Sequence, residues 1–526
     1  MTSNAVAIYD TTLRDGAQGA GLAFTLRDKL RITAMLDRMG VDYIEAGDPF
    51  SNPKDAEYFR EVKRPEHAKL VAFGSTCRAG HKPEEDEGLR ALAEAGADAV
   101  CIFGKSWSLH ATAVLGITPE ENVELIRSSV AWLKEQGLEV IFDAEHFFDG
   151  WKNDRSYALG VVRTALEAGA DCITLCDTNG GAFPQDVEAA VAEVFENLGK
   201  SVRLGIHAHN DCGMAEANAV LAVQNGVRVV QCTLNGWGER CGNTNLFTVA
   251  ANLTLKMGFD TLPDGTFRSL TRYANEFCEL CNREQYVHAP YVGPAAFSHK
   301  AGMHINAVEK LPQTFEHVRP EQVGAQRRFL VSEYVGRSAV WSRAREVEPW
   351  LKRDSEEIGK IAAEIKKLEY EGYQFEGAEA SFALLVKRAC GTFHPHFRLI
   401  GFNVTIAEPG VDGEVASAVV RIEVGGVEEV GGAVGNGPVN ALDRAMRRAI
   451  EKFYPQLADM RLEDYRVRVL GTGEASASIV RVIMESSDRS GRWATVGVSA
   501  DIVGASWSAL VDALEYKLMR DGAQYV

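Results

Sequence analysis

The sequence predicts a TIM (β/α)8 barrel at the N-terminus, followed by a helical linker region and a C-terminal α+β domain. Over the first 260 residues, short apolar runs alternate with longer amphipathic segments, and eight such units match the length of a closed barrel. A doubly wound open sheet is the alternative, but the glycine-rich dinucleotide loop expected after its first strand is missing. The expected strands are 6–10, 43–46, 70–74, 99–103, 140–144, 172–176, 203–208 and 229–234.

Amphipathic helices are expected between these strands, and their ends carry capping residues. Gly40 and Gly137 each follow a helical segment, where a C-cap favours a left-handed backbone. Thr118 and Pro119, followed by two glutamates, provide an N-cap, a first-turn proline and early acidic residues. The clearest helices are expected at 26–39, 119–136 and 184–198.

The alternation stops after about residue 260, and the chain divides into three expected parts. They are a catalytic barrel at 1–266, helical linker subdomains at 267–391 and an α+β domain at 392–526. In the last part, strands are expected at 397–405, 416–424, 465–470 and 479–485, with helices at 438–453 and 505–519. Turns or close backbone approaches are expected at Gly425, Gly426, Gly431, Gly432, Gly435 and Gly437.

Composition and charge limit the classes of function. The 526 residues carry a net charge of −17, which argues against a broad nucleic-acid surface. Apolar runs are too short to span a membrane, and the first residues lack the pattern of a secretory signal. The ten cysteines are scattered, and Cys278 and Cys281 have no second pair at zinc-site spacing. We therefore expect a cytoplasmic enzyme that binds neither nucleic acid nor membranes.

Ionisable and polar residues gather where the expected strands end. In a barrel these ends meet at one rim, where active sites lie. So many such groups at one rim are hard to explain by stability alone. The groups are Arg14 and Asp15 after the first strand, Glu45 and Asp48 at the second, Glu145 and His146 after the fifth, Thr178 after the sixth, His207 and His209 at the seventh, and Glu239, Arg240 and Asn243 after the eighth.

A histidine pair at the seventh strand indicates a metal site. His207 and His209 are two residues apart, so both side chains face the barrel axis. A lone buried histidine is more often a satisfied core residue, but a pair at this rim favours a divalent cation. Because the first strand adjoins the eighth in a closed ring, Asp15 can supply a carboxylate and Asn243 an amide oxygen. The ligand types suit Mn²⁺, Mg²⁺ or Zn²⁺.

Arginines at two places in the sequence, Arg14 and the pair Arg327-Arg328, each have two interpretations. Arg14, beside Asp15, is placed to hold a carboxylate or an enolate oxygen next to the metal. The alternative is an ion pair that closes the barrel mouth. Arg327 and Arg328 form either a local site for an anionic ligand or a solvated surface pair.

Three motifs together resemble the 2-isopropylmalate, homocitrate and citramalate synthase family. They are Asp10-Thr-Thr-Leu-Arg-Asp-Gly-Ala-Gln18, His207-Ala-His209-Asn-Asp and Gly238-Glu-Arg-Cys-Gly-Asn243. The stretch 142–150 looks closest to the citramalate-synthase branch, whose 2-oxo acid is pyruvate. The resemblance covers nearly the whole chain: 298–304 looks like the helical segment that carries a catalytic histidine, and 435–440 with 493–507 resembles the C-terminal regulatory, LeuA-dimer-like domain.

The resemblance implies an acyltransferase that condenses acetyl-CoA with pyruvate to give (R)-citramalate and CoA. This would be the first step of a threonine-independent route to isoleucine, with isoleucine as the expected feedback effector of a homodimer. The implied metal ligands are Asp15, His207 and His209, with Asn243 nearby. The implied catalytic and substrate-binding residues are Arg14 for the oxo-acid and enolate oxygens, Gln18 and Thr178 for substrate, and Glu145 and His304 for proton transfer.

One position departs from the family pattern. Relatives often have tyrosine in a T-Y-E-H stretch, whereas this chain has Phe315 between Thr314 and Glu316. A phenylalanine cannot donate a hydrogen bond or a proton. If the tyrosine takes part in proton transfer, that role is lost here or passes to another group such as Tyr334.

Four other functions remain open. A 2-isopropylmalate or homocitrate synthase would differ in the acceptor pocket, where one methylene is worth only about 1–3 kcal/mol. A metal-dependent carbon–carbon lyase or aldolase would use the same site, although the C-terminal domain argues against it. In a hydrolase barrel the H-x-H pair would follow the first strand. A catalytically inactive amino-acid sensor is opposed by the retained rim residues.

Overall fold

The computed structural model describes residues 4–330, 337–411, 414–470 and 479–524. The chain divides into two compact units. The first comprises Met1–Phe297 and Val318–Gln326, and the second comprises Ser298–His317 and Arg327–Val526. Buried apolar residues form separate cores within the two units.

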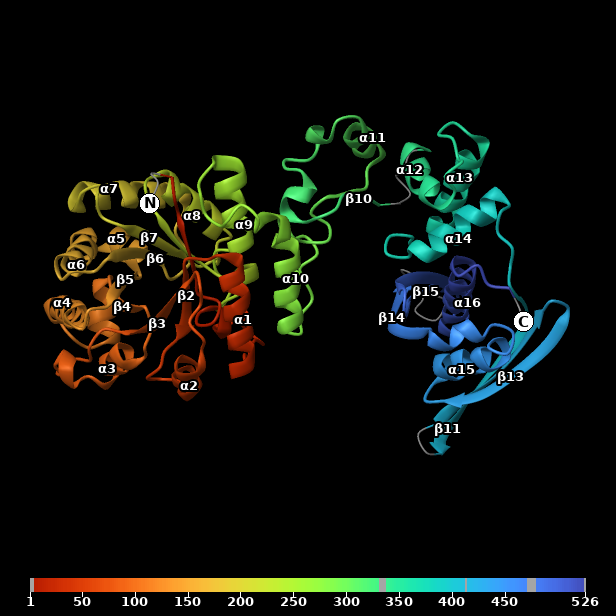
Figure 1. Cartoon of the computed structure of the whole chain (residues 1–526), viewed down its shortest axis with the longest axis horizontal. Helices are drawn as coiled ribbons and strands as arrows, with labels where there is room; N and C mark the ends of the chain where they lie inside the picture. The colour runs from red at the N-terminus through yellow and green to blue at the C-terminus, as the bar shows by residue number, and fades with distance from the viewer. Residues whose placement is uncertain (1–3, 331–336, 412–413, 471–478, 525–526) are drawn as a thin grey trace. The chain divides into compact units, whose positions relative to one another are not determined.

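Eight parallel strands close into a barrel in the first unit (Figure 1). β1 pairs with β2 on one side and with β8 on the other, so Asp10 lies opposite both Ile44 and Cys232. This closure confirms the predicted TIM barrel and excludes the open sheet. The strands are β1 Ala7–Asp10, β2 Tyr43–Gly47, β3 Lys69–Ser75, β4 Ala99–Lys105, β5 Glu139–Glu145, β6 Cys172–Asp177, β7 Leu204–Ala208 and β8 Val229–Cys232.

Helices surround the barrel (Figure 1). They are α1 Leu26–Met39, α2 Pro53–Glu61, α3 Glu87–Glu94, α4 Pro119–Glu135, α5 Phe147–Asn153, α6 Arg155–Glu167, α7 Pro184–Leu198, α8 Ala215–Gln224, α9 Leu246–Ala251 and α10 Leu270–Leu280. The caps act as the sequence predicts: Gly40 ends α1 in the left-handed conformation, and Thr118 and Glu121 form a capping box at α4. None of the helices in the described residues is long and apolar enough to cross a membrane.

The barrel interior changes from apolar to polar toward the carboxyl ends of the strands. Tyr43, Ile141 and Val229 belong to one buried layer across the barrel. Residues two positions further along a strand share the same face, so the next layer contains Glu45, Asp143 and Gln231 from the same strands. This polar layer places ionisable groups directly beneath the rim.

The second unit contains a helical part and two α/β motifs, each with three antiparallel strands and one helix. The elements are β9 Ser298–His299, α11 Gly302–Lys310, β10 Arg328–Phe329, α12 Arg337–Val347, α13 Glu356–Tyr370, α14 Glu379–Cys390, β11 Arg398–Val411, β12 Glu414–Val424, β13 Val427–Gly435, α15 Pro438–Ile450, β14 Arg461–Leu470, β15 Ile479–Asp488, β16 Gly491–Ser499 and α16 Ile502–Arg520. The two antiparallel sheets have the orders β11-β12-β13 and β14-β15-β16.

The strands predicted from the sequence do not include the short strands β9 and β10 in the linker region, nor β13 and β16 in the C-terminal domain. Glycines obscure β13, because Gly431, Gly432 and Gly435 resemble turn residues in the sequence. Gly425 and Gly426 form the turn between β12 and β13, both with positive φ, and Gly437 lies in the bend before α15. At Gly431 a Cβ atom would lie 2.0 Å from the Ala445 carbonyl oxygen of α15. The glycine therefore allows the helix to pack directly on the strand.

Candidate active site and metal centre

The turn after β1 brings Arg14 and Asp15 to the barrel rim. Asp10 ends the strand and accepts hydrogen bonds from the Thr12 amide and hydroxyl, both at 2.9 Å. The Thr12 hydroxyl in turn accepts a hydrogen bond from the Leu234 amide at 2.8 Å. This links the turn to the end of β8, so the loop that carries Asp15 is fixed across the closing seam of the barrel.

Asp15, His207 and His209 converge at this rim. The distance from Asp15 Oδ2 to His207 Nε2 is 3.2 Å, and that to His209 Nε2 is 3.7 Å. The two Nε2 atoms lie 3.3 Å apart, and all three residues are buried. Among the described residues these three form a cluster whose potential ligand atoms lie within 4.8 Å of one another.

Gln231 sets the orientation of the His207 ring. Its amide nitrogen donates to Asp143 Oδ1 at 2.8 Å, and this directs the Gln231 carbonyl oxygen to His207 Nδ1, also at 2.8 Å. An amide oxygen can only accept, so Nδ1 donates to Gln231, and Nε2 is the ring nitrogen that faces Asp15 and can bind a cation once it carries no proton. Metal-binding histidines are commonly oriented by an outer hydrogen bond of this kind.

The unsatisfied polar atoms also fit a cation. Asp15 Oδ2 and both amide atoms of Asn243 are buried and have no hydrogen-bond partner among the described residues. Asn243 pairs with His209 through an isolated backbone bridge, which places the two residues side by side. Buried carboxylate, amide and imidazole groups gathered in this way are suited to a divalent ion.

Charge in the cluster keeps Asp15 ionised. Burial opposes ionisation, but Arg14 and the two imidazoles outweigh it and hold the pKa of the Asp15 carboxyl far below its usual range. Burial lowers the pKa of His209 to about 4, assisted by the charge of His207. For His207 the Asp15 carboxylate overcomes burial and raises the pKa. A cation must therefore displace a proton from His207, so binding should strengthen as the pH rises.

Arg14 is held rigidly beside the cluster. Its Nε donates to Glu45 Oε1 at 2.6 Å, and its NH1 lies 3.6 Å from Asp15 Oδ2. The guanidinium carbon stands 3.9 Å above the centre of the Phe73 ring. Glu45 is itself fixed by the Tyr9 hydroxyl at 2.6 Å. The arrangement leaves a fixed cation directed at the cavity, as the sequence predicts for an oxyanion-binding group.

Most of the predicted site residues line one small cavity of about 220 Å³ at the rim. The predicted residues in its wall are Arg14, Asp15, Gln18, Glu145, Thr178, His207 and His209. Phe73, Phe103, Asp143, Cys176 and Glu239 complete the lining. Glu145 forms an ion pair with Lys105 from β4. The site residues predicted from the sequence did not include Gln231 or Lys105. Gln231 could have been found, because it lies two positions after the inward-facing Val229 on the same strand and therefore faces the barrel interior.

Comparisons with known proteins agree with this geometry. Residues 5–275 match the family described as HMGL-like, residues 291–372 the homocitrate synthase post-HMGL domain-like family, and residues 376–518 the LeuA allosteric (dimerisation) domain. The (R)-citramalate synthase of Geobacter sulfurreducens is 47% identical over 98% of this chain and 97% of its own length. That of Aquifex aeolicus is also 47% identical, over 98% of each chain. The chain belongs to the citramalate synthase family.

Other relatives are less similar. A probable 2-isopropylmalate synthase of Methanopyrus kandleri is 31% identical over 96% of this chain and 97% of its own. Membership of the citramalate synthase family confirms the predicted family, the barrel, the C-terminal LeuA-dimer-like domain and the prediction of an enzyme. HMGL-like enzymes use a divalent metal, and the cluster of Asp15, His207 and His209 is the candidate site for it.

The third predicted catalytic residue, His304, lies on α11 in the second unit. It is exposed, and its ring stacks on Phe315 with centroids 4.0 Å apart. The next residue, Glu316, is buried and accepts two hydrogen bonds from Arg327, at 2.5 and 2.6 Å. The Arg327 guanidinium therefore holds Glu316 in place. Tyr334, the alternative proton donor, lies outside the described residues.

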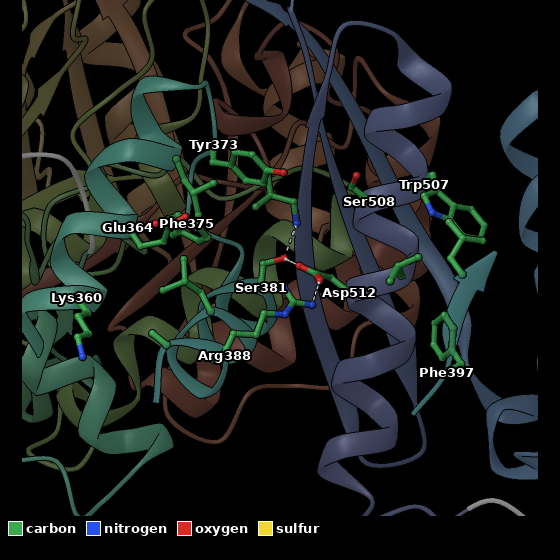
Figure 2. A pocket seen from close by; sticks show the side chains of 16 residues that line it. Lys360, Glu364, Tyr373, Phe375, Ser381, Arg388, Phe397, Trp507, Ser508 and Asp512 are labelled. Carbon is green, nitrogen blue, oxygen red and sulfur yellow. Dashed lines mark hydrogen bonds and ion pairs between the residues drawn. The ribbon is translucent and has the colours of Figure 1, made fainter. Parts of the chain in front are cut away.

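A larger cavity of about 750 Å³ lies within the second unit, between α13, α14, β16 and α16 (Figure 2). Three of its polar contacts link the surrounding elements. Asp512 accepts hydrogen bonds from the Ser381 hydroxyl at 2.7 Å and from Arg388 at 2.8 Å (Figure 2). The Ser381 oxygen also accepts from the Val496 amide at 3.0 Å. These contacts tie α14 to β16 and α16, and the rest of the lining combines apolar residues with polar ones such as Lys360 and Glu364.

Proposed function

We propose that this enzyme is an (R)-citramalate synthase, which condenses acetyl-CoA with pyruvate to give (R)-citramalate and CoA. The observation that carries the proposal is the 47% identity to curated (R)-citramalate synthases along almost the whole chain. The rim cavity supports it, because one small space contains a candidate metal cluster, a fixed cation and a carboxylate.

We infer that Asp15, His207 and His209 hold the divalent metal, with Asn243 as a further oxygen ligand. When bound, the metal would polarise the carbonyl and carboxylate oxygens of the 2-oxo acid. Mn²⁺, Mg²⁺ and Zn²⁺ all suit this ligand set. Arg14 would neutralise the developing oxygen charge, while Thr178 would bind the substrate carboxylate and Gln18 would contact the substrate from the cavity wall.

Proton transfer would be divided between Glu145 and His304. The methyl group of acetyl-CoA loses a proton to a base, and the resulting carbon forms a bond to the ketone carbon of the acceptor. The ketone oxygen takes up a proton to become the tertiary hydroxyl group. Water then cleaves the thioester, which releases CoA and makes the overall reaction irreversible. Lys105 pairs with Glu145 and fixes the position of this carboxylate.

The size of the cavity favours a short acceptor. Phe73 and Phe103 stack with ring centroids 5.4 Å apart and both line the cavity. Two aromatic rings restrict the space for a side chain longer than the methyl group of pyruvate. This agrees with the higher identity to citramalate synthases than to the 2-isopropylmalate synthase.

Initial rates of CoA release should decide the acceptor. With acetyl-CoA and added divalent metal, pyruvate should give a kcat/KM at least about a hundredfold above those of 2-oxoisovalerate and 2-oxoglutarate. Chiral analysis should identify the product as (R)-citramalate. No turnover of pyruvate would contradict the proposed acceptor. CoA release that does not depend on any 2-oxo acid would contradict the acyl transfer itself.

We further propose a homodimer that senses isoleucine through its C-terminal domain. The LeuA allosteric (dimerisation) match covers 376–518. The sheet β11-β12-β13 exposes apolar side chains on the face away from α15: Val419, Val430 and Val434 are about half exposed on β12 and β13. In the other sheet Val467 and Val469 are exposed on the edge strand β14. Burial of such surfaces drives association between copies of a chain.

Isoleucine at millimolar concentration should reduce the initial rate of the full-length enzyme several-fold. The physical reason is that an effector shifts the population toward the conformation that it binds best. Rates and thermal melting are measured with isoleucine and, as matched controls, with alanine and D-isoleucine. Unchanged rates and melting temperatures with isoleucine would contradict the assignment of this effector.

A further inference from the structure

The chain turns sharply at His146, directly after Glu145 at the end of β5. His146 has φ 58°, in the left-handed region that residues other than glycine rarely adopt. It is buried, and it precedes the first turn of α5. A strained conformation of this kind persists only where neighbouring contacts hold it, and such residues cluster at active sites.

Two bridges join His146 to the loop after β6. The His146 backbone amide donates a hydrogen bond to the Thr178 hydroxyl oxygen at 2.8 Å. The His146 ring contacts Asp149 Oδ2 through Nδ1 at 3.0 Å. The same Asp149 oxygen accepts a hydrogen bond from the Asn179 amide at 2.9 Å. The backbone and the side chain of one residue therefore hold two successive residues of the next loop.

The first bridge restricts the direction of the Thr178 hydroxyl hydrogen. A hydroxyl group has one hydrogen and two lone pairs. Because the His146 amide occupies one lone pair, the hydroxyl hydrogen must point elsewhere, and Thr178 lines the rim cavity. A hydroxyl that accepts from the protein in this way is arranged to donate to an anionic ligand.

The second bridge and ring packing keep the turn in place. The pKa of Asp149 is lowered, since the hydrogen bonds from His146 and Asn179 outweigh its burial. An ionised Asp149 can only accept, so His146 Nδ1 carries the hydrogen of this bridge. On its other side the His146 ring packs on His110, with ring centroids 4.0 Å apart, and Trp107 lies next to both.

We propose that His146 is a positioning residue that turns the Thr178 hydroxyl into a donor for the carboxylate of the 2-oxo acid. It does so through the backbone amide, and the Asp149–Asn179 bridge holds that amide in its left-handed turn. This inference rests on the proposed function, because it assigns a substrate group to Thr178. It also explains why a strained residue follows Glu145: one turn aligns the ends of β5 and β6.

Steady-state kinetics of His146→Ala, Thr178→Val and the double variant test this coupling. His146→Ala should raise KM for the 2-oxo acid about tenfold, with KM for acetyl-CoA changed less than about twofold and kcat less than about threefold. In the Thr178→Val background, the same change at His146 should alter KM by less than about twofold. His146→Asn should raise KM less than His146→Ala, because asparagine tolerates the left-handed turn.

The result can be separated from the identity of the acceptor. The Kd of the 2-oxo acid is measured by calorimetry with the metal-loaded enzyme and no acetyl-CoA, and it should rise by the same factor as KM. Wild-type enzyme that prefers another 2-oxo acid would correct the proposed acceptor, and the variants are then compared with that acid. Effects of His146→Ala and Thr178→Val that multiply, or equal increases in KM for both substrates, would overturn the inference.

Discussion

Replacing Asp15 by asparagine or His207 by alanine should reduce the rate of CoA release by about a thousandfold or more. Asp15 and His207 place a carboxylate oxygen and an imidazole nitrogen 3.2 Å apart. Removing either leaves the cavity without a ligand set that can retain a divalent ion at low concentration. The barrel should still fold, because the apolar layer beneath the cluster is untouched.

Metal content and activity are measured together for these variants. Each should contain less bound metal after dialysis than the wild type, while circular dichroism and melting remain similar. A chelator should inactivate the wild type, and added Mn²⁺, Mg²⁺ or Zn²⁺ should restore it. His394→Ala removes an exposed imidazole of the second unit and should leave both properties unchanged. Wild-type metal content in both site variants would show that the cluster is not the metal centre.

Replacing Arg14 by lysine should lower kcat by about a hundredfold to a thousandfold, even though the charge is kept. The guanidinium is held in one plane by Glu45, by the face of Phe73 and by the charge of Asp15. A lysine ammonium cannot reproduce this planar fork, so the donor directed at the developing oxygen charge is lost.

The kinetic pattern distinguishes two roles for Arg14. If it stabilises charge in the transition state, kcat and kcat/KM should fall together in Arg14→Lys, with little change in metal content. Arg27→Lys, on the exposed side of α1, is the matched control and should behave as the wild type does. Near-normal turnover of Arg14→Lys would show that Arg14 only balances charge at the barrel mouth.

The strands and helices of the barrel could be predicted because each element leaves a local pattern in the sequence. The predicted helices 26–39 and 184–198 coincide with α1 and α7, since apolar spacing and capping residues define both ends. The strand β13 escaped prediction for the opposite reason. Its glycines are suited to turns locally, and only the packing of α15 on the strand explains them.

The convergence of Asp15, His207 and His209 could be predicted from the sequence. Two histidines two apart on a barrel strand share a face, and the turn after β1 reaches the same rim because the barrel is closed. The hydrogen bond of Gln231 to His207, the ion pair of Lys105 with Glu145 and the stacking of Phe315 on His304 appear only in three dimensions. Glutamine, lysine and phenylalanine are common residues without a chemical signature of their own. They gain a role only when folding brings residues that are distant in the sequence together, around one cavity or in contact with one another.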